Sequence, residues 1–222
     1  MDLPPLFRDR SSTDPVGEAA AAGRAGEAPG LVLHDLAQTR MRAAILFAPE
    51  IPPEDAAVML PLCAVGFQNA LGVLAPPEVA VHLGWDGAIR LNGGTCGALS
   101  LYAGVDWLVI GLALDLWPSE GDGGHTPDRT ALYAEGCGDV TPPELLSAWV
   151  RHTLSWLDTW EHDGAAPLLR DWSGLSDEIG QTVTVAGHTG TALGLDDTFA
   201  LVLKSGEDTT LVPLTALRKD VP

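Results

Sequence analysis

The stretch EVAVHLGWDGAIRLNGGTCGALSLYAGVDWLVIGLALDL, residues 78–116, decides the fold of this chain. Asparagine, aspartate and glycine divide it into short apolar or alternating runs, which lie at residues 79–83, 88–91, 95–101 and 107–116. Runs of this kind are typical of paired β-strands. Asn92-Gly93-Gly94 predicts a tight hairpin turn, because Asn and Gly accept the positive φ angle that such turns need. The last run is almost entirely apolar, which predicts a strand buried on both faces in the middle of the sheet.

The sequence on either side of this sheet predicts helices. An alanine-rich run at 16–24 predicts one helix, and apolar periodicity over 53–74 predicts a second. Pro61 lies inside that second pattern and should kink the helix or shift its start. Thr141-Pro142-Pro143-Glu144 matches a capping box, and the tryptophan stripe that follows it predicts a third, half-buried helix.

Beyond residue 175 the pattern changes to four short alternating runs, whose spacing predicts a small SH3-like barrel or meander. We therefore expect an α+β fold in two domains. Residues 1–175 would form a mixed, largely antiparallel sheet flanked by helices. Residues 176–222 would form a small C-terminal β-barrel that packs on the first domain, because so small a unit rarely stands alone.

Charge and composition exclude several classes of partner. The chain has 30 acidic and 12 basic residues and a formal net charge of −18, which repels phosphate backbones and anionic lipid. We therefore expect neither nucleic acid nor a membrane surface as partner. We also expect no membrane-spanning run and no signal peptide, and hence a cytoplasmic protein. The three cysteines lack CxxC spacing, which argues against a disulfide framework or a zinc site.

The chain has two lysines, Lys204 and Lys219, and residues 1–203 contain none. A mechanism that needs an ammonium group in the main domain is therefore excluded unless the C-terminal tail reaches into it. A glycine-rich loop at 118–139 places Cys137 between two glycines, which would let backbone amides approach a bound carbonyl beside a nucleophile. A plain turn is equally compatible with this loop. His125 in the same loop lacks metal-ligand spacing with its neighbours, so no metal site is expected.

The order and spacing of these segments resemble the biotin/lipoate protein ligase superfamily, which contains biotin protein ligases, lipoate ligases and octanoyltransferases. Residues 30–42 resemble the strand and Gln-Thr start of that family's adenylate-binding loop. Residues 82–99 resemble its Lys-Trp-Pro-Asn-Asp strand and Asn-Gly-x-Lys-x-x-Gly hairpin, and 107–116 resemble its Gly-x-Gly-x-Asn strand. The resemblance implies a fold like that of class II biotin ligases and lipoate ligases. It also implies a set of substrate-binding positions, namely Ser12, Thr13, Gln38, Arg40, Trp85, Gly93, Gly94 and Gly97.

Departures from the family pattern bear on the chemistry. Gly84 stands where the family has the lysine of its tryptophan motif, and Gly94 stands where it has the hairpin lysine that holds the acyl carboxylate. The arginine-glycine loop that binds the adenylate phosphate is reduced to Arg40-Met41-Arg42. A ligase must attract an acyl carboxylate and a triphosphate, both of them anionic. A main domain without lysine is poorly suited to that task, so ATP-dependent ligation is the least favoured of the family's activities.

Three activities follow from the resemblance. Residues 111–137 resemble the octanoyltransferase layout, which implies acyl transfer through a thioester on Cys137, with an acyl-carrier, biotinyl or lipoyl domain as partner. The activating lysine of that layout maps to Gly94, so His125 or Arg129 would have to activate the thiol. The second possibility is binding without catalysis, by a module that recognises biotin, lipoate or octanoate, or a carrier domain. The third is an ATP-dependent ligase in which arginines, namely Arg40, Arg42 and Arg90, replace the lysines.

Overall fold

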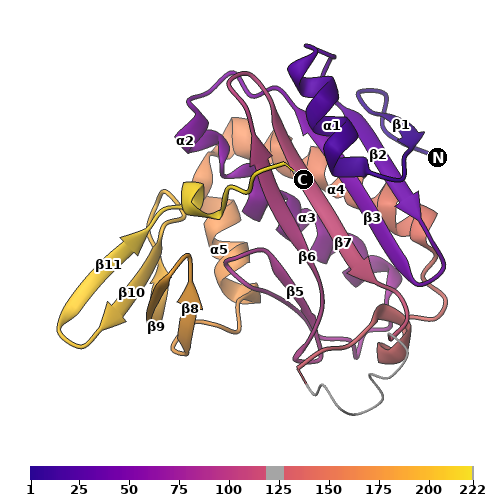
Figure 1. The fold of residues 1–222 in the computed structure, drawn as a ribbon. Helices are drawn as coiled ribbons and strands as arrows, with labels where there is room; N and C mark the ends of the chain where they lie inside the picture. The colour runs from indigo at the N-terminus through magenta and orange to yellow at the C-terminus, as the bar shows by residue number, and fades with distance from the viewer. Residues whose placement is uncertain (119–127, 222) are drawn as a thin grey trace.

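The computed structural model describes residues 1–118 and 128–221 of the chain. Its main sheet has seven strands in the order β1-β2-β3-β7-β6-β5-β4 (Figure 1). The first two strands pair in parallel, and every other neighbouring pair is antiparallel. The strands are β1 (Arg8–Ser11), β2 (Leu31–Leu36), β3 (Arg40–Phe47), β4 (Val81–Leu83), β5 (Ala88–Leu91), β6 (Gly94–Ala103) and β7 (Leu108–Asp115).

The stretch 78–116 forms the second half of this sheet, as its pattern predicts. β7 lies between β3 and β6, and both of its faces are covered. The turn between β5 and β6 places Asn92 at φ 49° and Gly93 at φ 91°, which confirms the tight hairpin. A bulge at the pairing of Ile89 with Gly97 and of Arg90 with Thr95 leaves one extra residue on β6.

Helices cover both faces of the sheet (Figure 1). On one face α1 (Pro15–Arg24) packs against β2, β3 and β7. On the other face α3 (Met59–Leu74) packs against the sheet and against α4 (Pro142–Asp163) and α5 (Ala165–Leu175).

Pro61 shifts the start of the second predicted helix, as expected. The helical segment is divided into α2 (Pro53–Ala56) and α3, and the proline lies in the first turn of α3, where its missing N–H costs nothing. The expectation that no run reaches membrane-spanning length was wrong. Pro53–Leu74 covers 22 residues with a mean hydropathy of 1.7, but 72% of its apolar window is buried inside the protein. Its hydrophobicity is that of a central core helix.

The C-terminal strands form an open antiparallel sheet in the order β11-β10-β9-β8, and the predicted SH3-like barrel is not closed. These strands are β8 (Thr182–Val185), β9 (His188–Leu195), β10 (Leu201–Ser205) and β11 (Asp208–Val212). Phe199 and Leu201 of this sheet belong to the same buried cluster as α3 and α4. The small sheet therefore packs on the main domain, as its size predicts.

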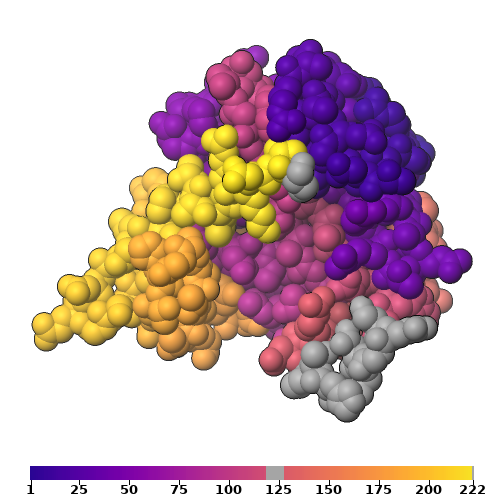
Figure 2. Space-filling view, in the orientation of Figure 1, coloured from indigo at the N-terminus to yellow at the C-terminus, as the bar shows by residue number. Residues whose placement is uncertain are grey.

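After the small sheet, a short 3₁₀ helix η2 (Leu214–Leu217) leads the chain back over the main sheet. Figure 2 shows this C-terminal segment in yellow, lying on the sheet beside the indigo residues of α1. Arg218 forms an isolated parallel bridge with Leu101 of β6, and the Lys219 N–H donates to the Leu101 carbonyl at 2.8 Å. Val221 packs against the hydrophobic cluster beneath α1.

Candidate functional site

A cavity of about 170 Å³ lies on the α1 face of the main sheet. The first turn of α1 forms one side of it, and β3, β6 and β7 form the rest. The cavity is small and partly apolar, which suits a compact organic ligand with a few polar atoms. Its lining includes Asp14, Pro15, Val16, Arg42, Ala43, Ser100, Tyr102, Gly111, Leu112 and Ala113.

Small residues on β7 open this cavity. A methyl group on Gly111 would come within 2.8 Å of the Val16 side chain on α1, so the space between helix and strand depends on the absence of a side chain there. Ala113 lies two residues further along the same face of β7. The absence of a side chain at Gly111 thus has a packing role.

The predicted segment Ser12-Thr13-Asp14 shapes the rim of the cavity. The Ser12 hydroxyl accepts the Asp14 N–H at 3.0 Å, and the Asp14 carboxylate caps α1 by accepting the Gly17 N–H at 3.1 Å. Asp14 lines the cavity, whereas Ser12 is buried and the Thr13 side chain is exposed. The Thr13 carbonyl accepts a hydrogen bond from Arg42 Nη2 at 3.1 Å.

The arginines of the reduced phosphate loop are already paired with carboxylates. Arg42 forms an ion pair with Asp35, and Arg40 Nε donates to Asp115 Oδ1 at 2.9 Å. Arg129 Nη2 contacts the other oxygen of Asp115 at 3.2 Å. These carboxylates offset the positive charge that would attract a phosphate chain.

Most of the other residues predicted for the site lie away from the cavity. Gln38 is exposed in the turn between β2 and β3, and Gly93 lies in the turn between β5 and β6. Gly94 packs on Thr130, and Gly97 lies against the backbone of β7 at Ala113. Together with Arg40, these four residues are absent from the cavity lining.

Trp85 holds the two sheets together. It is 3% exposed, its indole N–H donates to the Phe199 carbonyl at 3.0 Å, and its backbone N–H donates to Glu178 at 2.9 Å. Glu178 also forms an ion pair with Arg90 at 2.9 Å. These contacts give Trp85 and Arg90 a structural task in the described part of the chain, at the junction with the small sheet.

Cys137 is fully buried and is absent from the cavity lining. It belongs to the hydrophobic cluster that contains α3 and α4. Burial, and to a smaller extent the charge of Glu135, raise the pKa of the Cys137 thiol. A nucleophilic cysteine needs the opposite shift. His125, proposed to activate it, lies outside the described residues, and Arg129 is engaged by Asp115.

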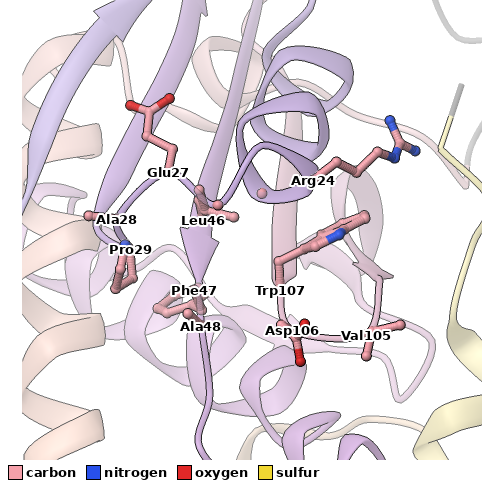
Figure 3. A pocket seen from close by; sticks show the side chains of 12 residues that line it. Arg24, Glu27, Ala28, Pro29, Leu46, Phe47, Ala48, Val105, Asp106 and Trp107 are labelled. Carbon is pink, nitrogen blue, oxygen red and sulfur yellow. The ribbon is translucent and has the colours of Figure 1, made fainter.

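A larger, open hollow of about 500 Å³ lies at the far end of α1, where β3 ends and the turn between β6 and β7 begins. Figure 3 shows Arg24 and Trp107 at its edge, and the Arg24 guanidinium lies 5.5 Å from the centre of the indole ring. None of the residues predicted for the site lines this hollow. In the described residues no group of three or more His, Cys, Asp or Glu side chains is placed to hold a metal ion.

The tail brings a lysine side chain to the main domain, although Lys219 is not one of the residues that line the cavity. Lys219 Nζ donates to the Ser100 hydroxyl at 2.9 Å, and Ser100 lines the cavity. Residues 1–203 contain no lysine, so an ammonium group can reach the main domain only from the tail, and Lys219 does so. Local sequence pattern could not show this contact, because 119 positions separate the two residues.

Comparison with known proteins identifies the family to which this fold belongs. Residues 3–174 match the model of the biotin/lipoate A/B protein ligase family, and residues 179–220 match a domain of unknown function, DUF4444. The chain is 46% identical to a biotin protein ligase-like protein of unknown function from Silicibacter sp., with a TM-score of 0.92 over 98% of this chain and 99% of that one. No curated protein matches.

More distant structures share the fold. Biotin protein ligase from Aquifex aeolicus in complex with biotin and ATP has a TM-score of 0.71 at 15% identity, over 93% of this chain and 94% of that one. Biotin protein ligase from Leishmania major in complex with biotinyl-5-AMP has a TM-score of 0.63 at 17% identity, over 95% and 98%. Because the family model covers most of the chain, this protein is a member of the biotin/lipoate A/B protein ligase family.

Proposed function

We propose that this protein is a binding module of the biotin/lipoate ligase family, which holds biotin, lipoate or octanoate in the α1-face cavity without ATP-dependent ligation. The observation that carries the proposal is a cavity lined by Gly111 and other small residues, beside arginines that are already neutralised by carboxylates. The relatives from Aquifex aeolicus and Leishmania major were crystallised with biotin or its adenylate, which supports an acyl ligand of this kind.

Charge argues against a triphosphate as second ligand. Arg40 and Arg129 share Asp115, and Arg42 is held by Asp35, so each of these arginines would have to exchange a carboxylate for a phosphate. The net charge of −18 on the chain makes the approach of a triphosphate still less favourable. Phosphate recognition in proteins uses cations that are free to form charge-assisted hydrogen bonds. Binding of the acid alone needs no such rearrangement.

Calorimetric titration with biotin, lipoate and octanoate tests the proposal, with and without ATP and Mg²⁺. We expect at least one acid to bind, with no pyrophosphate released when ATP is added. The Gly111→Ala variant should weaken binding by about tenfold or more, because its methyl group enters the space between α1 and β7. Gly138→Ala is the matched control, since a methyl group there meets no atom within 4 Å. Pyrophosphate release with any of the acids would contradict the proposal.

Acyl transfer through Cys137 is the alternative within the same family, and it brings in an acyl-carrier, biotinyl or lipoyl domain as partner. The buried thiol and its raised pKa count against it. Incubation with an octanoylated carrier domain, followed by mass spectrometry, separates the two functions. We expect no octanoyl group on Cys137 and no transfer to a second carrier domain. Transfer that is lost in Cys137→Ser would establish the alternative.

A further inference from the structure

The C-terminal tail is fixed on the main sheet by contacts that do not involve the Lys219 ammonium group. The Lys219 N–H donates to the Leu101 carbonyl at 2.8 Å, and the Arg218 side chain donates to the Ala103 carbonyl. Val221 packs on the apolar cluster beneath α1. The backbone therefore holds the position of residue 219, whatever its side chain binds.

The ammonium group has hydrogen-bonding capacity to spare. It donates to the Ser100 hydroxyl at 2.9 Å and forms no ion pair with a carboxylate in the described part of the chain. A lysine ammonium has three donors, and a neutral hydroxyl satisfies one of them without offsetting the charge. Arg42, the cation that lines the cavity, is by contrast held by Asp35 and by the Thr13 carbonyl.

The charges around the cavity favour one orientation of a bound acid. Asp14 lines the wall at the start of α1, and its carboxylate disfavours a second negative charge near it. Ser100 lines the wall on β6, where the Lys219 ammonium arrives. An amphiphilic acid would thus place its carboxylate toward Ser100 and its apolar part against the small lining residues Ala43 and Ala113.

We infer that Lys219 is the residue that receives the carboxylate of the bound acid, so that the C-terminal tail completes the binding site and selects a free monocarboxylate over its neutral derivatives. The inference rests on the proposed function, because it names the charge that the ligand of that cavity carries. The inference assigns the binding of the carboxylate to the tail and not to the main domain.

Calorimetry with matched pairs of ligands tests the inference, each acid (biotin, lipoate or octanoate) being compared with its primary amide. In Lys219→Gln we expect binding of the acid to weaken by about tenfold or more, and binding of the amide to change by less than about twofold. Lys219→Arg should restore most of the affinity for the acid. Lys204→Gln removes the chain's other lysine from β10 and is the control for net charge.

The outcomes separate the two proposals. If the wild type binds an acid, and Lys219→Gln binds it as well as Lys204→Gln does, the role of Lys219 is overturned and the proposed function stands. Equal losses for acid and amide would show that Lys219 only supports the wall, which also overturns it. If the wild type binds none of the acids, both proposals fail together.

Amine labelling gives a second measurement on the unmodified protein. Because the chain has two lysines, a short reaction with an acetylating reagent followed by peptide mass spectrometry reports on Lys219 with Lys204 as internal reference. We expect a saturating acid to slow acetylation of Lys219 several-fold, and the amide to have little effect, since a bound carboxylate favours the protonated ammonium and only the neutral amine attacks the reagent. Equal rates with and without the acid would overturn the inference.

Discussion

At the scale of single residues, Glu178 is a charged side chain in buried surroundings. Its side chain is 9% exposed, accepts the Trp85 backbone N–H at 2.9 Å and pairs with Arg90 at 2.9 Å. Asp177, next to it in the chain, pairs with the same arginine at 3.2 Å but is 33% exposed. The two acids differ mainly in burial, so they form a natural comparison.

We predict that Glu178→Ala lowers the free energy of unfolding by about 2–4 kcal/mol, because it leaves the buried Trp85 N–H without a partner and removes the more buried of the two carboxylates that pair with Arg90. Asp177→Ala should cost less than about 1 kcal/mol, as expected for an ion pair near the surface. Urea unfolding followed by tryptophan fluorescence measures both. If both variants lose the same free energy of unfolding, burial does not determine how much an ion pair with Arg90 contributes to stability.

The three thiols share one property, which is that each is buried. Burial raises the pKa of Cys96 to about 12 and also raises the pKa values of Cys63 and Cys137. A raised pKa means that less thiolate is present at any given pH, so alkylation should be slow up to about pH 9. We predict that iodoacetamide leaves the native protein unmodified at pH 8 and adds three groups once urea unfolds it. Rapid modification of Cys137 alone would reveal an activated thiol.

At the scale of elements, β6 and β7 approach so closely that glycine is required between them. A methyl group on Gly97 would lie 3.0 Å from the Leu114 Cα and would overlap the Ala113 carbonyl oxygen. We predict that Gly97→Ala lowers the free energy of unfolding by about 1–3 kcal/mol, since backbone atoms cannot move aside easily. Gly174→Ala, at an open position in α5, should stabilise by about 0.5–1 kcal/mol. If thermal unfolding shows that Gly97→Ala and Gly174→Ala are destabilised equally, the packing argument is contradicted.

Elements whose signals are local were predictable from the sequence. β5, β6 and β7 fall where the alternating runs and the Asn92-Gly93 turn place them, because each signal lies within the element. The predicted capping box at the start of α4 takes another form, in which the Thr141 hydroxyl donates to the Glu144 carboxylate at 2.6 Å. The parallel pairing of β1 with β2 was not predicted, because nothing in the sequence of residues 1–10 specifies a distant partner.

The candidate site was less predictable than the fold. The predicted residues Ser12 and Thr13 do not line the cavity, whereas Asp14, which caps α1, does. Trp85 lies instead between the two sheets, where its indole N–H finds the Phe199 carbonyl. The position of a buried aromatic side chain depends on packing partners from the whole chain. The sequence around residue 85 does not identify these partners.

At the scale of the whole molecule, the two sheets share one core. Phe199, Leu201 and Leu214 of the C-terminal part are buried in the same cluster as Trp85 and Trp172 of the main domain. We predict that the full chain unfolds in a single calorimetric transition, because neither part can lose this interface alone without exposing large apolar side chains. A fragment of residues 176–222 should show no cooperative unfolding by circular dichroism. A folded fragment, or two separate transitions, would contradict the shared core.

The hydrogen bond between Lys219 and Ser100 has a consequence for protein synthesis. A ribosome makes the cavity wall at Asp14 among the first residues and the ammonium group among the last, so a growing chain has a nearly complete sheet long before it has a charged anchor for an acid. A messenger that stops early, anywhere within β8–β11, would give a product that lacks this ammonium group. On the inference that Lys219 receives the acid, only chains translated through to the tail would bind it.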